Sequence, residues 1–134
     1  MSHPLTNDER EERIRAVLAA ASAADPDAQV ACYADEIVLE FPFGAPPGQI
    51  HGKDAIRAAL VNAFQSFRFT LTPHQFHHAA DSSVVEFTGR GTYLPTGADY
   101  NNTYIAVFEF TGNLISRQRE YFNTAYAASV ISAT

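Results

Sequence analysis

Hydrophobic and polar residues alternate with a period of two over much of the C-terminal half of the chain. Residues 100–110 and 114–122 are rich in β-branched and aromatic side chains, and the turn-forming sequence Thr111-Gly112-Asn113 separates them. This pattern predicts a long antiparallel hairpin. One face of its first strand carries Asn102, Tyr104, Ala106, Phe108 and Phe110.

The second strand of this hairpin sets polar groups among apolar neighbours. Arg117, Arg119 and Glu120 all fall within it. Polar side chains in an otherwise apolar strand are typical of a pocket wall. We therefore expect the hairpin to form one side of a binding site.

The N-terminal residues have the spacing of amphipathic helices. Thr6 and Glu9 match a capping box, which predicts a first helix that ends near Ala24. Its inner face is expected to carry Ile14, Val17, Leu18 and Ala21. Asp25 followed by Pro26 predicts a second, short helix, because aspartate caps helices and proline favours the first helical position.

A strand over Ile37–Phe41 is predicted next, after the second helix. Residues 42–49 hold several prolines and glycines and are expected to form a loop. Phe43, an apolar residue in this loop, is expected to fold over the mouth of a cavity. A third helix is predicted from about Lys53 to Gln65.

Two more strands precede the hairpin. Residues 67–71 present their odd-numbered side chains inward, whereas after Pro73 the inward positions are even-numbered, which predicts a bulge at the proline. The next strand covers residues 84–94. Its glycines, Gly89 and Gly91, indicate strong coiling or a close approach of a neighbouring segment.

This order of elements predicts an α+β fold. A curved antiparallel or mixed sheet should wrap around three N-terminal helices and leave a cone-shaped cavity. The chain has 134 residues, of which 46% are hydrophobic, and this length fits one domain spanning residues 1–134 with a well-packed core.

The net charge and the cysteine content exclude several classes of partner and of covalent or metal site. The net charge of -6 argues against a nucleic acid or an anionic membrane, since both attract basic patches. Cys32 is the single cysteine, which excludes an intramolecular disulfide and a cysteine-based metal cluster. The N-terminus has no signal-peptide pattern and no apolar run reaches membrane-spanning length, so we expect a cytoplasmic protein.

Three segments resemble the SnoaL-like group of the nuclear-transport-factor-two-like superfamily: residues 33–43, residues 51–56 and residues 117–122. The resemblance implies a cystatin-like α+β barrel. It also implies a homodimer that pairs across the outer face of the sheet. It does not imply one activity, because this fold hosts enzymes, binding modules and assembly domains.

The resemblance allows three family mechanisms to be compared with this sequence. The positions of the ketosteroid isomerase proton shuttle and of its two oxyanion donors fall on Phe41, Val17 and Ala106, which are all apolar. The first arginine and aspartate of limonene-type epoxide hydrolases fall on Phe87 and Gly89, and only their last acid has a counterpart, in Glu120. SnoaL-type polyketide cyclases rely on one pocket carboxylate, and Glu120 is suited to that role.

Glu120 has two interpretations on the sequence alone. Apolar surroundings would raise the pKa of its carboxyl toward the range useful for proton transfer. A salt bridge with Arg117 or Arg119 is the alternative. Asn102 and Tyr104 should share its face and could orient a carbonyl or enolate, although Tyr104 also suits the core.

The histidines near residue 76 form a second candidate group. His74 and His78 are expected to face inward and His77 outward. Their spacing along a strand is too wide for adjacent metal ligands, so we expect no metal. His78 is a candidate acid/base or donor beside Glu120, with a hydrogen-bonded wall histidine as the alternative.

The predicted function is cofactor-free acid/base catalysis of the cyclase or isomerase type. Its catalytic residues are Glu120, His78 and Tyr104, and its ligand is a small apolar or polycyclic, carbonyl-bearing molecule. The alternative is a non-catalytic ligand-binding or dimerisation module of the same fold. The predicted substrate-binding residues are Asn102, Phe41, Phe43, Phe64, Phe76, Phe87, Val17, His74, Gln118 and Phe122.

Overall fold

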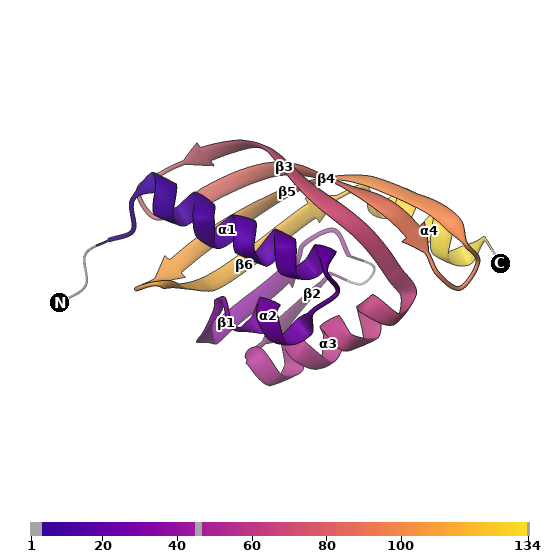
Figure 1. The fold of residues 1–134 in the computed structure, drawn as a ribbon, viewed down its shortest axis with the longest axis horizontal. Coiled ribbons are helices and arrows are strands. Elements are labelled where there is room, and N and C mark those ends of the chain that lie inside the picture. The colour runs from indigo at the N-terminus through magenta and orange to yellow at the C-terminus, as the bar shows by residue number, and fades with distance from the viewer. Residues whose placement is uncertain (1–3, 45–46, 134) are drawn as a thin grey trace.

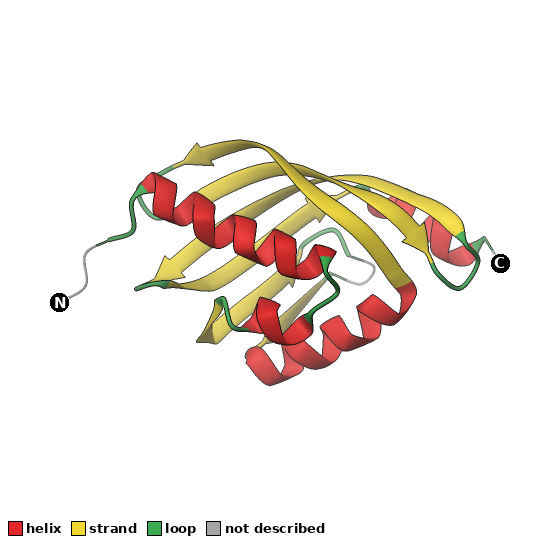
Figure 2. Ribbon diagram, in the orientation of Figure 1, coloured by secondary structure: helices red, strands yellow, loops and turns green. Residues whose placement is uncertain are grey.

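A six-stranded sheet in the order β2-β1-β6-β5-β4-β3 forms the body of the protein. The computed structural model describes residues 4–44 and 47–133. Figure 1 shows the element order, and Figure 2 shows how α1 crosses the concave face of the sheet while β3 curves around it. The elements are α1 (Asn7–Ser22), α2 (Pro26–Val30), β1 (Tyr33–Phe41), β2 (Gly48–His51), α3 (Lys53–Ser66), β3 (Phe67–His78), β4 (Ser83–Tyr93), β5 (Ala98–Thr111), β6 (Leu114–Phe122) and α4 (Thr124–Ser132).

The sheet is mixed. Strands β3 to β6 form an antiparallel meander, whereas β1 runs parallel to β6, with Leu39 opposite Gln118. Strand β2 pairs antiparallel with the other edge of β1. The predicted α+β fold, with a curved sheet wrapped around helices, is confirmed.

The helix caps agree with the sequence. The hydroxyl of Thr6 accepts from the backbone N–H of Glu9 at 3.1 Å, and the Glu9 carboxylate accepts from the N–H of Thr6 at 2.9 Å, which completes the capping box. The Asp25 carboxylate accepts from the N–H of Ala28 at 3.0 Å, and Pro26 opens α2. The four apolar residues predicted for the inner face of α1 are all buried.

The bulge predicted at Pro73 is present. The pairing of β3 with β4 shifts register between Pro73 and Gln75. Before the shift the odd-numbered residues are the more buried ones, and beyond it Phe76 and His78 take their place. One extra residue therefore rotates the rest of β3 by one position.

Three features differ from the prediction. Strand β1 begins at Tyr33 rather than at Ile37. Residues 48–51 form an edge strand that takes in the end of the predicted loop 42–49, because β1 offers them backbone pairing that the local sequence does not reveal. The C-terminal helix α4 was not predicted; it is capped by Asn123, and its Tyr126 hydroxyl bonds to backbone groups of β5.

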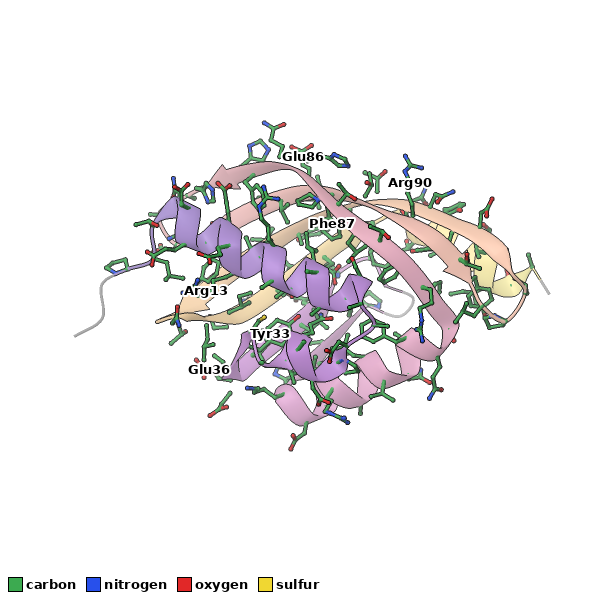
Figure 3. The ribbon with its side chains drawn as sticks, viewed as in Figure 1. Arg13, Tyr33, Glu36, Glu86, Phe87 and Arg90 are labelled. Atoms are coloured by element: carbon green, nitrogen blue, oxygen red, sulfur yellow. The ribbon has the colours of Figure 1, made fainter. Side chains whose placement is uncertain are left out.

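The core lies between α1 and the concave face of the sheet. The largest fully buried side chains there include Tyr33, Phe87 and Phe108. Figure 3 shows Phe87 on the side of β4 that faces α1, whereas Glu86 and Arg90 of the same strand project away from the helix. No helix among residues 4–44 and 47–133 is long and apolar enough to cross a membrane.

Gly91 allows β3 and β4 to approach closely, as the sequence predicted. A methyl group at this position would lie 2.6 Å from the Cα atom of Phe69 and would overlap the carbonyl oxygen of Arg68. Backbone atoms of a paired strand cannot move aside without breaking the sheet ladder. Gly91 is therefore required by packing.

We predict that Gly91→Ala destabilises the protein by about 3 kcal/mol or more, since the added methyl forces two strands apart. Thr92→Ala, at the next position of the same strand, is the control and should cost about 1 kcal/mol or less. Chemical denaturation measures both free energies of unfolding. Equal stabilities of the two variants would contradict this account of Gly91.

Candidate functional site

A cavity of about 310 Å³ lies between the concave face of the sheet and helices α1, α3 and α4. Its wall is almost entirely apolar and combines side chains from β1, β3, β5 and β6 with those of the helices. Five polar side chains also line it: Gln29, Tyr100, Tyr104, Gln118 and Glu120. The few polar groups in an apolar wall would determine how a ligand is oriented.

Glu120 extends from the inner face of β6 into this cavity. It lies opposite Ala106 on β5, whose small side chain leaves room for the carboxyl group. Its carboxylate accepts a hydrogen bond from the amide of Gln118 at 3.3 Å. The residue is half-buried, because its side chain borders the cavity.

The surroundings of Glu120 change its acidity. Removal from bulk water raises the pKa of its carboxyl from 4.5 to about 7, and the hydrogen bond from Gln118 offsets only a small part of this rise. Both the protonated and the ionised forms are thus populated near neutral pH. A carboxyl group with this pKa can both accept and donate a proton.

The two neighbouring arginines belong to the opposite face of the sheet. Arg117 pairs with Glu40 at 2.8 Å, and Arg119 approaches the same carboxylate at 3.8 Å. The hydrogen bond from Arg117 lowers the pKa of Glu40. Since side chains alternate along β6, both arginines are held away from Glu120. The salt bridge that the sequence left open is made by Glu40 instead.

A group of hydroxyls lies next to Glu120 on the same face of the sheet. Tyr104 on β5 is opposite Phe122, one inward position away from the pair formed by Ala106 and Glu120. The hydroxyls of Tyr104 and Tyr100 are 3.0 Å apart. Burial raises the pKa of the Tyr104 phenol, so it remains protonated.

Asn102 does not line the cavity, contrary to the prediction. Its amide oxygen accepts from the backbone N–H groups of Thr103 and Asn123, which turns its amide nitrogen toward the Tyr100 hydroxyl at 3.0 Å. The short side chain is thereby held within the hairpin. Tyr100, which was not predicted, reaches the cavity in its place.

The tyrosine pair has one hydroxyl hydrogen that no protein group accepts among the described residues. Tyr100 and Tyr104 carry one hydroxyl hydrogen each, and the bond between them uses one of these two. The bond that Tyr100 accepts from Asn102 uses an amide hydrogen and leaves the other hydroxyl hydrogen unused. The second hydrogen has no acceptor among the hydrogen bonds of the described residues. Because both tyrosines line the cavity, this hydrogen can be offered to a ligand oxygen.

The aromatic residues predicted for the cavity divide into two groups. Phe41, Phe64 and Phe122 lie in its wall, together with Val17 and Gln118. The rings of Phe41 and Phe122 meet edge to face at 6.4 Å.

The other three predicted phenylalanines lie elsewhere. Phe43 is 64% exposed and packs on Tyr121, because the turn after β1 leads away from the cavity. Phe87 is fully buried and stacks on Tyr104 at 4.8 Å, so it supports the wall without forming it. Phe76 packs beneath Arg15 of α1.

The histidines do not line the cavity either, which corrects the predictions for His74 and His78. His74 sits at the bulge, is exposed, and bonds to Thr88 at 2.8 Å. His78 faces inward, but the strand beyond the bulge meets the N-terminal part of α1, where His78 bonds to Glu11 at 2.7 Å. No group of three or more metal-ligating side chains occurs among the residues that the structure describes.

A buried chain of hydrogen bonds leads to Glu120 and was not predicted. The Gln29 amide donates to the Tyr33 hydroxyl at 3.0 Å, and Tyr33 donates to the amide oxygen of Gln118 at 2.6 Å. Gln118 then donates to Glu120. Glutamine usually faces solvent, so the sequence carries no signal for Gln29. Tyr33 was missed because the predicted strand began only at Ile37, whereas β1 begins at Tyr33.

Comparison with known proteins identifies the family. Residues 14–118 match the SnoaL-like domain. The chain belongs to the SnoaL-like domain family. This match runs from α1 to the middle of β6 and ends two residues before Glu120, and it confirms the resemblance found in the sequence.

The SnoaL-like chain also matches individual proteins. The uncharacterised protein YesE of Bacillus subtilis (strain 168) is 32% identical over 94 residues, a match that spans 66% of this chain and 64% of that relative. A provisionally assigned isomerase from Bacillus subtilis superposes with a TM-score of 0.87 at 25% identity and covers 95% of both chains. A Catenulispora acidiphila protein with a ketosteroid isomerase-like fold gives a TM-score of 0.79 at 15% identity, with 89% of this chain and 91% of that one covered.

The raised pKa of Glu120 has a consequence for stability. The folded SnoaL-like protein holds this proton more tightly than the unfolded chain, so the free energy of unfolding falls as the pH rises from about 4.5 to about 7. We predict a loss of about 2 kcal/mol from this group between pH ~5 and pH ~8.

Glu120→Gln isolates this contribution, because the amide does not titrate. Between pH ~5 and pH ~8 the wild type should lose about 2 kcal/mol of unfolding free energy relative to Glu120→Gln. Denaturation at both pH values measures it, and the other titrating groups cancel in the difference. A pH-independent difference would contradict a raised pKa.

Proposed function

We propose that this SnoaL-like protein is a cofactor-free acid/base enzyme of the isomerase or cyclase type, acting on an apolar, carbonyl-bearing small molecule. The observation that carries the proposal is a carboxyl group with a pKa of about 7 in an apolar cavity, separated by the sheet from both neighbouring arginines. Such a group suits a proton shuttle at neutral pH.

In the proposed reaction, ionised Glu120 removes a proton from a carbon next to the substrate carbonyl. The C–H bond breaks, an O–H bond forms on Glu120, and the electron pair moves to the carbonyl oxygen as an enolate. The protonated carboxyl returns the proton to another atom of the substrate in an isomerisation. In a cyclisation, the enolate carbon attacks a second carbonyl and the proton goes to the new alkoxide.

Tyr100 and Tyr104 are suited to stabilise the negative charge that develops on the carbonyl oxygen in this reaction. The unused hydroxyl hydrogen of Tyr104 or Tyr100 would bond to the carbonyl oxygen, and the bond would strengthen as negative charge develops there. The donation from Asn102 to Tyr100 polarises the pair in the same direction. Both tyrosines stay neutral at physiological pH, because burial raises the pKa of each.

The wall of the cavity indicates the class of ligand. Phe41 and Val17, at two positions where the resemblance places proton-handling residues of ketosteroid isomerases, are apolar and border the cavity. Proton transfer is therefore assigned to β6 rather than to β1 or α1. A volume of about 310 Å³ lined by aromatic rings suits a flat molecule of a few fused rings with few polar groups.

A proton-exchange assay tests this proposal without knowledge of the natural substrate. The probe is 2-tetralone, a bicyclic ketone, and NMR follows the replacement of its α-hydrogens by deuterium in D2O. The wild type should accelerate the exchange over buffer. Glu120→Gln should lose about 100-fold or more of this acceleration, and Tyr104→Phe about 10-fold or more.

Glu86→Gln, on the outer face of the sheet, is the matched control and should leave the rate unchanged. The circular dichroism of each variant checks that it is folded. An equal exchange rate for the wild type and Glu120→Gln would refute the role of Glu120. Binding of 2-tetralone in the cavity without any exchange would favour a non-catalytic ligand-binding module instead.

A further inference from the structure

The hydrogen bonds that end at Glu120 have one consistent direction. Tyr33 has a single hydroxyl hydrogen, and at 2.6 Å its partner is the amide oxygen of Gln118. The Tyr33 oxygen is free to accept and receives the amide hydrogen of Gln29. Because the oxygen of Gln118 is held by Tyr33, its amide nitrogen faces Glu120.

The opposite orientation of Gln118 is unfavourable when Glu120 is ionised. It would bring an amide oxygen against the carboxylate and an amide N–H group against the hydroxyl hydrogen of Tyr33. A primary amide that is not held at its oxygen can rotate between these two orientations. Tyr33 is fully buried and belongs to β1, whereas Gln118 and Glu120 belong to β6, so the restraint joins adjacent strands of the sheet.

We propose that Tyr33 is a positioning residue, which holds the amide of Gln118 so that it orients the carboxylate of Glu120 in the cavity. The proposal rests on the proposed function of Glu120, which makes the orientation of the carboxylate matter for proton transfer. Tyr33 does not border the cavity and acts through Gln118 alone. Gln29 acts one hydrogen bond further along the same chain, because it directs the hydroxyl of Tyr33, although its own side chain also borders the cavity.

The other ionisable groups on this side of the sheet do not replace the restraint. Glu120 acts electrostatically on three tyrosines, Tyr33 from β1 and Tyr100 and Tyr104 from β5. Burial raises the pKa of each, so they remain neutral. The hydrogen bond from Gln118 is therefore the interaction that stabilises the ionised form of Glu120.

Titration of the Glu120 carboxyl carbon by carbon-detected NMR tests the proposal. In Tyr33→Phe the amide of Gln118 is released, the ionised carboxylate loses its donor, and the pKa of Glu120 should rise by about half a unit or more. Gln118→Met, which removes the donor itself, should raise it at least as far. The double variant Tyr33→Phe/Gln118→Met should match Gln118→Met, because the effect of Tyr33 passes through that side chain.

Tyr121→Phe is the matched control, since Tyr121 follows Glu120 directly but lies on the outer face of the sheet; it should leave the Glu120 pKa unchanged. If Tyr33→Phe does not fold, Gln29→Met tests the same chain from its far end and should raise the pKa by a smaller amount. An unchanged pKa in Tyr33→Phe or in Gln29→Met would overturn the proposal. The proposal would also be overturned if the pKa shifts of Tyr33→Phe and Gln118→Met added up in the double variant, because Tyr33 would then act independently of Gln118.

The titration separates this proposal from the proposed function, because it uses no substrate. A protein that fails to exchange 2-tetralone but shows the dependence on Tyr33 would refute the catalytic role and keep the positioning. A protein that exchanges 2-tetralone through Glu120 with a pKa insensitive to Tyr33 would keep the function and refute the positioning.

Discussion

The separation of opposite charges by the two faces of β6 is the constraint on which the site depends. Arg117 and Arg119 lie on one face, where both approach the carboxylate of Glu40 on β1, and Glu120 lies on the other, facing the cavity. A shift of one residue in the pairing of β6 would exchange these positions. It would place two arginines in an apolar cavity, where neither has a partner and both carry a large desolvation penalty.

The same register gives Glu120 its neighbours. Ala106 opposite it leaves space for the carboxyl group, and Tyr104 lies one inward position along β5. On the other side, Gln118 lies two residues earlier on the same face, within reach of Tyr33 on the parallel strand β1. The acid, the hydroxyl donors and the positioning chain thus follow from the pairing of three strands, while the helices supply the apolar cover that raises the pKa of Glu120.

Local patterns in the sequence were enough to predict most of the fold. The capping box at Thr6, the bulge at Pro73 and the alternation in the final hairpin each depend on residues close together in the chain, and all three are present. Strand β2 and helix α4 depend on partners far away in the chain, so their sequences alone did not reveal them. Similarly, alternation predicted the face of Glu120 but could not show that Glu40 would pair with the arginines.

The incorrect site predictions have a common cause. The positions of His78 and Phe76 on the inner face of β3 are correct, but the sheet is longer than the cavity, and its far end packs against the beginning of α1. His74 occupies the bulge, where alternation does not determine the direction of the side chain. The polar residues missed by the sequence analysis, Gln29 and Tyr33, are buried by tertiary packing between α2 and the sheet.

The ionisation of Glu120 in the unmodified protein is the most direct test of the central claim. Carbon-detected NMR follows its side-chain carboxyl carbon through the pH range, and Glu120→Gln assigns the signal. We predict a midpoint at about 7, as expected for a carboxyl group in an apolar cavity without a cationic partner. A midpoint at or below the ordinary value of 4.5 would mean a solvated or ion-paired carboxylate and would contradict the proposed acid/base site.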